Sequence, residues 1–461
     1  MDKNQTFLEK AIEGGVWLSS SALAVRLISL LSAIIVLRNL SVSEYGTYHL
    51  VLAAFGFLAS FFISGLDPII INDLARERGD GRIDRMKRLF FEYGAIKLGI
   101  GCVLFAVAFF GSTVLGRWYA SDIIYFLRAM SFLLLFIALE RMLHFLFNIY
   151  LKFRFMALFT IVEEAAKLSL ILLFVVYFAK GVEGLVLAYM LSTGIALLLF
   201  APYGMSLLRP LLRQSMARES MLLPLVREHG KWGLASRYIN EAQKFVRPWL
   251  IKAFVGVEAV GLYSLAEGIY SQLVSLVPLS NLLAPLIPGE IKNHARMRAI
   301  VLYGTKYGTL LFVLLGIISF FFVPRLLAWF FPQYVPAVSL FRLMLLAMLT
   351  TAAAHVVNTV LFSYREQKTL FFLTIIRLVF LVFTASLLLW IFGTAGAAIE
   401  FVLTAIFFVW IRYLSLKRVA PDISIPFREF FRFTQEDRAF LQNARWHFYC
   451  VFCRLVTFAQ P

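Results

Sequence analysis

The sequence predicts an all-α polytopic membrane protein of about twelve transmembrane helices, arranged as two six-helix bundles that repeat each other in the same orientation. Three observations lead to this prediction. Apolar residues make up 61% of the 461 residues and charged residues only 15%, whereas a soluble protein keeps about a quarter of its residues charged. Long apolar segments recur along the whole chain, and short motifs of the first half return in the second.

The composition excludes most soluble classes of protein. Mean hydropathy is +0.81, so few residues could cover a water-facing surface. The three cysteines do not form a disulfide framework, and the single CxxC at 450–453 lacks a second ligand pair, so we predict no metal site and no cofactor. No cleavable signal peptide is expected, because the first apolar segment is long enough to remain as an anchor.

The apolar segments match helices rather than membrane strands. A spanning helix needs about 20 mostly apolar residues, and strands of a membrane barrel would alternate over about 10. The most polar segment, 232–253, is also compatible with an amphipathic helix on the membrane surface. The predicted spans are 16–37, 45–65, 91–114, 123–148, 157–179, 183–203, 232–253, 260–283, 301–323, 337–361, 369–391 and 394–414.

Lys and Arg are distributed unevenly between the two sides of these spans. Basic segments such as NDLARERGDGRIDRMKR and GEIKNHARMR all fall on the side of the N-terminus. By the positive-inside rule both termini then lie in the cytoplasm. The topology accounts for most of the net charge of +17, so no nucleic-acid partner is needed to explain it. The loops on the opposite side hold only Arg38, Arg117, Lys180, Lys252 and Arg325.

Two pairs of motifs indicate that the chain is an internal repeat. SVSEYGTYHL at 41–50 matches GVEAVGLYSL at 256–265, and GVEGLVLAYML at 181–191 matches GTAGAAIEFVL at 393–403. Because six spans separate the two copies, both halves enter the membrane in the same direction, as in transporters with parallel repeats around a central site. We therefore predict an N-terminal lobe at 1–215 and a C-terminal lobe at 216–420. The tail at 421–461 is expected to be a cytoplasmic amphipathic helix, or else a reentrant segment around 439–459.

Many charged residues fall inside the predicted spans, where each costs about 2.5–3.5 kcal/mol on insertion scales. They should face a watery cavity or pair with one another. A cationic cavity suits an anionic cargo, and the planar fork of Arg suits phosphate. The predicted cargo-binding cations are Arg26, Arg237, Lys244 and Arg377.

Carboxylates in the same spans have a second predicted role. Glu163, Glu241 and Glu267 are expected to hold the cavity cations apart or to take up a coupling ion, H⁺ or Na⁺. Lys167 follows Glu163 by four residues, which also fits a plain structural ion pair.

The segment 232–253 carries the densest set of charges. Arg237, Glu241, Lys244 and Pro248 recur every three or four residues and so share one helix face. Pro248 removes a backbone hydrogen bond and favours a kink. We interpret this segment as a cavity-lining helix with a hinge.

Sequence motifs argue against catalysis. The chain has no nucleophile elbow, P-loop, HExxH or Asp-rich metal motif. The longest outer connection, 324–336, is short for a membrane polymerase or ligase, and no Gly-rich filter loop indicates a channel. A transporter that is not an enzyme remains, with a multidrug exporter, a polysaccharide polymerase or ligase, and a non-transporting scaffold as alternatives.

The segments LRNLSVSEYGTYHLVLAAFGFLASFF and AVGLYSLAEGIYSQLVSLVPLSNLLAPLIP, together with GVEGLVLAYML, resemble Wzx-type polysaccharide flippases of the multidrug/oligosaccharidyl-lipid/polysaccharide exporter superfamily. The resemblance covers about residues 15–415 and rests on a pattern of turns and small residues. It implies two bundles around a V-shaped cavity that opens alternately to each side.

The resemblance also implies a function. An undecaprenyl-diphosphate-linked oligosaccharide would move from the inner to the outer leaflet of a bacterial inner membrane, driven by an ion gradient, for O-antigen or exopolysaccharide synthesis. The implied partners are this lipid, membrane lipid, and polysaccharide polymerases and glycosyltransferases.

Overall fold

The computed structural model of the chain describes residues 7–62, 67–119, 121–217, 220, 222, 231–284, 287–290, 293–364, 366–423 and 429. Within these ranges helices dominate and no strand occurs, which confirms the all-α prediction. The CxxC and the predicted helical or reentrant segment of the tail lie outside the described residues.

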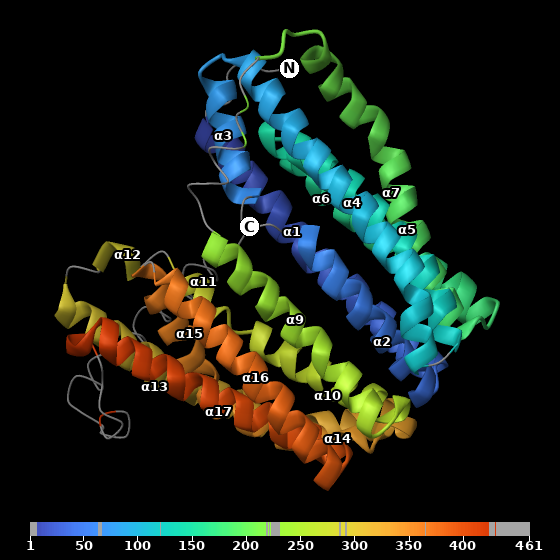
Figure 1. The fold of residues 1–461 in the computed structure, drawn as a ribbon, viewed down its shortest axis with the longest axis vertical. Coiled ribbons are helices and arrows are strands. Elements are labelled where there is room, and N and C mark those ends of the chain that lie inside the picture. The colour runs from blue at the N-terminus through green and yellow to red at the C-terminus, as the bar shows by residue number, and fades with distance from the viewer. Residues whose placement is uncertain are drawn as a thin grey trace, which may run out of the picture.

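The first bundle contains the helices of the N-terminal half (Figure 1). Each of the first six predicted spans corresponds to one helical segment here, and the short helix α3 is additional. The segments are α1 (Phe7–Asn39), α2 (Val42–Ala59) with the 3-10 turn η1 (Ser60–Phe62), α3 (Asp67–Gly79), α4 (Ile83–Tyr119), α5 (Ser121–Ile149), α6 (Phe153–Ile171) with the π-helical η2 (Leu172–Tyr177), and α7 (Gly181–Leu212).

The second bundle repeats this plan with the helices of the C-terminal half. The predicted boundary at 215/216 falls in the connection between the bundles, most of which is outside the described residues. The segments are α9 (Lys231–Phe254), α10 (Val257–Ser275), α11 (Leu279–Leu283), α12 (Ile287–Glu290), α13 (His294–Phe330), η3 (Pro332–Tyr334), α14 (Ala337–Met344), η4 (Leu345–Ala347), α15 (Met348–Ser363), α16 (Gln367–Phe392), α17 (Thr394–Val419) and η5 (Pro421–Ile423).

The described helices are those of a multi-pass membrane protein. Nine helical segments among them are long and apolar enough to cross a membrane. The other three predicted spans correspond to α6 with η2, to α9 and to α10, which are shorter or carry more charge. Helix α9 packs against both α16 and α2, which favours a spanning helix over one that lies on the membrane surface.

Equivalent helices make equivalent contacts in the two bundles. In the first, α1 packs on α6, α4 on α5, and α6 on α7. In the second, α9 packs on α16, α13 on α15, and α16 on α17. The two bundles therefore share one topology in one orientation, as a parallel repeat requires.

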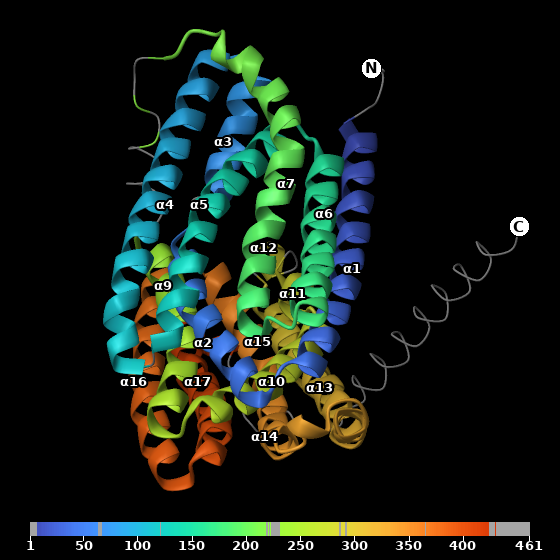
Figure 2. The same cartoon turned by 90° about the vertical axis from the view of Figure 1, so that its right-hand side faces the viewer.

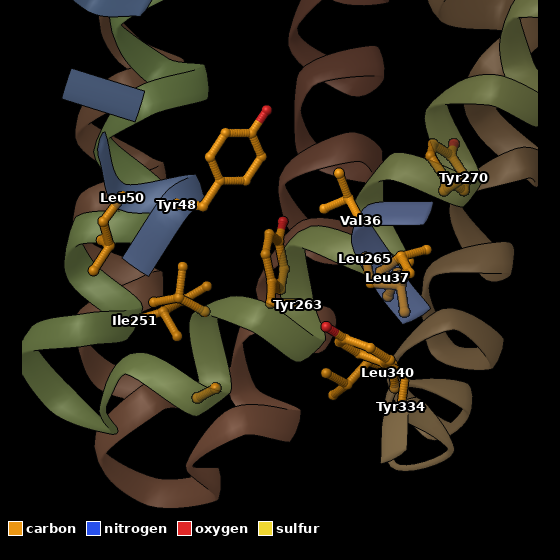
Figure 3. Packing of buried hydrophobic residues seen from close by; sticks show 14 of the residues in the cluster. Val36, Leu37, Tyr48, Leu50, Ile251, Tyr263, Leu265, Tyr270, Tyr334 and Leu340 are labelled. Atoms are coloured by element: carbon orange, nitrogen blue, oxygen red, sulfur yellow. The ribbon is translucent and has the colours of Figure 1, made fainter. Parts of the chain in front are cut away.

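The bundles meet at one end and diverge toward the other, so that together they form a V (Figures 1 and 2). At the joined end one hydrophobic core includes side chains from both bundles, among them Leu40 and Tyr48 from the first and Ile251, Tyr263 and Tyr334 from the second. Figure 3 shows Tyr48, Ile251, Tyr263 and Tyr334 among the side chains of this core.

Helices α2 and α10 cross at two glycines that occupy equivalent positions in the repeat. A Cβ atom on Gly46 would lie 2.1 Å from the carbonyl oxygen of Val257, and one on Gly261 would lie 2.3 Å from that of Val42. Each glycine thus faces the backbone of the other bundle, where no side chain can move aside. The repeated Gly-x-Tyr motif is explained by this crossing, since the backbones need both positions free of a Cβ.

Hydrogen bonds between the bundles reinforce the crossing. The Tyr334 hydroxyl donates to the carbonyl oxygen of Leu40 at 3.1 Å, and the Gln333 amide donates to that of Leu37 at 3.0 Å. Burial raises the pKa of the Tyr334 hydroxyl, so it stays protonated and remains a donor. Ser41 and Glu44 form a capping box that fixes the start of α2 beside these bonds.

The outer connection predicted at 324–336 is wrong in its extent. Helix α13 continues through Pro324 to Phe330, which leaves only a short turn before α14. The extension is stabilised because Val323 and Leu327 are buried in the core shared by the two bundles.

We predict that Gly46→Ala lowers the free energy of unfolding by about 1–3 kcal/mol, because the new methyl group meets a backbone carbonyl. Thermal unfolding of the detergent-solubilised protein measures the change. Gly268→Ala on α10 is the matched control: nothing lies within 4 Å of its Cβ position, so it should raise stability by about 0.5–1 kcal/mol. Equal effects at the two positions would contradict the close crossing.

Candidate functional site

One charged face of α9 is not covered by a neighbouring helix. Tyr238 stacks on Phe61 of η1 with ring centroids 5.0 Å apart, and the Gln243 amide donates to the carbonyl oxygen of Thr374 on α16 at 2.8 Å. Between these contacts lie Glu241 and Lys244, with the Lys244 ammonium 3.0 Å from the Glu241 carboxylate. Lys244 is 64% exposed. Because lipid solvates charge poorly, we infer that this face borders the space between the bundles.

Arg26 lies on the exposed, polar strip of α1. Ser19 and Ala22 precede it by seven and four residues and therefore share its face. The adjacent face carries Leu23 and Leu27, which are 63% and 57% exposed and suit contact with lipid. Within the described part of the chain no carboxylate lies within ion-pair distance of Arg26, so its charge remains available to a ligand.

A polar network lies inside the first bundle between α1, α6 and α7. Lys167 pairs with Glu164 at 2.5 Å, and Glu164 also accepts a hydrogen bond from Ser29 of α1 at 3.2 Å. The expected ion pair of Lys167 with Glu163 is therefore wrong. Glu163 instead accepts a hydrogen bond from Thr193 of α7 at 2.6 Å. The pairing differs because Glu163 bonds to Thr193 of α7, while Glu164 is within reach of both Ser29 of α1 and Lys167.

A second network lies inside the second bundle. The Arg247 guanidinium donates two hydrogen bonds to Glu400 of α17, at 2.7 and 3.2 Å, and lies 3.4 Å from Glu267 of α10. Thr404 donates to the same Glu400 carboxylate at 2.6 Å. Glu400 is fully buried, whereas Glu267 is 30% exposed. Two carboxylates thus share one guanidinium, and the more exposed of them is the one with the weaker contact.

Sequence reasoning missed the central pair of this network. Arg247 lies beside the predicted polar face of α9, and Glu400 is one of several isolated charges in apolar segments. The two residues are 153 positions apart. An isolated carboxylate within an apolar span is a signal that a partner exists, but it does not tell which cation is the partner.

The remaining predicted site residues are not gathered into a single cluster. Arg377 is within the second bundle, its guanidinium 4.4 Å from the centroid of the Phe408 ring. Arg237 is part of α9, but its side chain is outside what the structure describes. The described residues contain no group of three or more His, Cys, Asp or Glu side chains placed to hold a metal ion.

Taken together, the two diverging bundles and the charges within them define a multi-pass helical membrane protein with the architecture of a transporter. A family model described as polysaccharide biosynthesis protein matches residues 11–288. The match covers more than half of the chain, which therefore belongs to this family.

Solved structures of similar fold come from one superfamily. An inward-facing multidrug resistance transporter of the MATE family, in the MOP superfamily, gives a TM-score of 0.69 at 16% identity, over 86% of this chain and 94% of that one. The lipid II flippase MurJ gives 0.68 at 12% identity, over 90% and 89%. A MOP superfamily transporter from Pyrococcus furiosus gives 0.59 at 13% identity, over 90% and 96%. At these identities the likeness shows the fold alone.

A search of curated proteins found no significant sequence match.

We predict that Glu400→Ala lowers the free energy of unfolding by about 3–5 kcal/mol, because it leaves the buried Arg247 guanidinium without its main partner. Glu241→Ala, which breaks the exposed pair with Lys244, should change stability by less than about 1 kcal/mol. Chemical unfolding in a mild detergent compares the two. A loss of similar size in both variants would refute the distinction between the buried and the exposed pair.

Proposed function

We propose that this protein flips a lipid-diphosphate-linked oligosaccharide from the inner to the outer leaflet of a bacterial plasma membrane by alternating access, without catalysing a reaction. The observation that supports the proposal most directly is that the contact between the bundles and the exposed cations lie in different parts of the molecule. The bundles contact each other tightly at one end through α2 and α10, while α1 and α9 present exposed cations where the bundles diverge.

The cavity charges support an anionic cargo. Arg26 has no carboxylate partner in the described part of the chain, and Lys244 is largely exposed despite its contact with Glu241. A diphosphate would find two exposed cations, one on each bundle. The family membership and the flippase among the similar structures support a lipid-linked sugar as the cargo.

Ion coupling is a further part of the proposal. Glu163 and Glu267 are carboxylates held inside separate bundles, each with a hydrogen-bonding or cationic partner. Uptake of H⁺ or Na⁺ at one of them would alter the charge balance of that bundle during transport. Glu241, by contrast, is engaged by Lys244 on the cavity-lining face.

The orientation follows from the distribution of basic loops. The end at which the bundles diverge carries the start of α1, helix α3 and the end of α7 (Figure 1). These are the segments rich in Lys and Arg, so we place this end in the cytoplasm. The cavity then opens toward the leaflet in which a lipid-linked precursor is made.

Multidrug export is the second candidate, supported by the structural similarity to a MATE transporter. Cationic drugs favour an acidic cavity, and the unpaired Arg26 argues against one.

Liposomes that contain the protein and a fluorescent undecaprenyl-diphosphate sugar test the transport. We expect gradient-dependent exposure of the sugar, and about a tenfold or greater loss of initial rate in Arg26→Gln and Lys244→Gln, because each removes a charge-assisted contact. Lys180→Gln, which removes an exposed cation paired with Glu183 at the other end of the molecule, should leave the rate unchanged.

If the sugar is exposed at the wild-type rate in both cavity variants, the protein is still a flippase, but Arg26 and Lys244 do not bind the cargo. Absence of exposure under proton and sodium gradients, together with export of a cationic dye, would favour the drug exporter.

Cysteine labelling tests the orientation. Tyr177 is the last residue of η2 and is 78% exposed. In a background with Cys102, Cys450 and Cys453 replaced by Ser, we expect Tyr177→Cys to react with a membrane-impermeant maleimide in intact cells. Ser215→Cys, beyond the other end of α7, should react only after permeabilisation. The reverse pattern would invert the proposed topology.

A further inference from the structure

Two arginines of the second bundle share one aromatic ring. The guanidinium of Arg377 on α16 lies 4.4 Å from the centroid of the Phe408 ring, and that of Arg412 on α17 lies 3.8 Å from the same centroid. Both cations therefore lie against the same ring, which is their common support. Cation–π contact stabilises each guanidinium but does not neutralise it.

Neither arginine forms an ion pair with a carboxylate among the described residues, and Glu400, which acts on Arg377 from a greater distance, is already paired with Arg247. The Nε atom of each is buried without a hydrogen-bond acceptor. The contact of Arg412 with the carbonyl oxygen of Ala354 is long, at 3.5 Å. Arg247 in the same bundle is, by contrast, neutralised in the usual way by two carboxylates. Two neighbouring cations without ion-pair partners lower the stability of a membrane protein. Since the protein itself does not neutralise them, we infer that a bound anion does.

The conformation of Arg412 is not that of a side chain reaching for the membrane surface. Helix α17 ends at Val419, and an arginine this near a helix end normally extends toward the interface. Arg412 instead lies over Phe408, one turn in the opposite direction, toward the middle of the helix. The guanidinium is thus kept at the ring beside Arg377.

The position of the pair suits the headgroup of a lipid. Arg377 is in the first half of α16 and Arg412 in the last third of α17, so both lie in the half of the bundle nearer the open end of the V (Figure 1). Polar groups continue next to them, since His355, which follows Ala354, lies with its Nδ1 atom 2.7 Å from the Ser280 hydroxyl. An anion bound here would be a little below the membrane surface.

We propose that Arg377 and Arg412, held by Phe408, form a binding site for a diphosphate group. Two linked phosphates offer each guanidinium its own pair of oxygens, which matches the planar fork of Arg. In the flippase proposed above, on which this assignment rests, the group is the diphosphate of the lipid-linked cargo, held here at a second position besides the one between Arg26 and Lys244. The phosphate of an ordinary phospholipid has related chemistry and is the competing source.

Binding of undecaprenyl diphosphate to the purified full-length protein in nanodiscs tests the site, with undecaprenol as the probe that lacks phosphate. We expect binding of the diphosphate alone, and about tenfold or greater weakening in Arg377→Gln and in Arg412→Gln. The affinity of the double variant should fall by less than the product of the two single effects, because both residues contact the same bound group.

Arg342→Gln is the matched control. Arg342 also lies over an aromatic ring, 4.5 Å from the centroid of Phe320, and no second arginine of the described residues lies over that ring. Its replacement should leave the affinity unchanged.

Stability separates a binding role from a structural one. Without ligand, Arg412→Gln should unfold at the same temperature as the wild type or higher, because it removes a half-buried charge that has no ion-pair partner among the described residues. Undecaprenyl diphosphate should raise the unfolding temperature of the wild type and not that of the variant. A lower unfolding temperature of the ligand-free variant, with unchanged affinity, would overturn the proposal.

Two further outcomes distinguish this proposal from that of the function. If the wild type flips the sugar lipid and Arg377→Gln and Arg412→Gln bind and flip equally well, the site is wrong and the flippase stands. If binding depends on both arginines but anionic phospholipid displaces the diphosphate at equal concentration, the pair is a site for phospholipid headgroups, and the assignment to the cargo is overturned.

Discussion

The crossing of α2 and α10 is the contact on which the arrangement of the two bundles depends. At Gly46 and Gly261 each backbone approaches the other so closely that a single methyl group would collide with a carbonyl oxygen. Small residues permit such approach between membrane helices, where packing must replace the hydrophobic driving force. Tyr334 and Gln333 add hydrogen bonds across the same end. With the joined end so defined, the other end is free to hold a cavity, and the alternating access proposed above would require that these contacts break and reform.

The charges within the bundles divide into two kinds, and the division has a physical meaning. Arg247 with Glu400, and Lys167 with Glu164, are ion pairs that satisfy one another. Such pairs fix the helices of one bundle relative to each other. Arg26 has no such partner in the described chain. A charged residue without a partner lowers the stability of the fold. Such a residue is kept where it serves ligand binding or transport.

The repeat explains why the same residue types recur at matching places but with different chemistry. The glycine pairs are kept because both copies meet the same backbone geometry: Gly181 and Gly393, 212 positions apart, each have a positive φ, of 52° and 56°, at the turn into the last long helix of their bundle. The intramembrane charges are not kept. Glu163 and Glu164 of α6 have no acidic counterpart at the equivalent level of α16, where Arg377 occurs instead. Backbone constraints are thus shared between the bundles, while the intramembrane charges differ between them.

The sequence by itself determined the all-α membrane fold, a helix for every predicted span, and the repeat, because hydropathy and glycine spacing are local properties that the bilayer imposes on each segment separately. It also located many of the charges within the predicted spans. It did not determine their partners. The Arg247–Glu400 pair, the choice of Glu164 by Lys167, and the shared ring of Arg377 and Arg412 join residues on different helices. Only tertiary packing sets the rotation of one helix against another, and an ion pair requires that rotation to within a few Å.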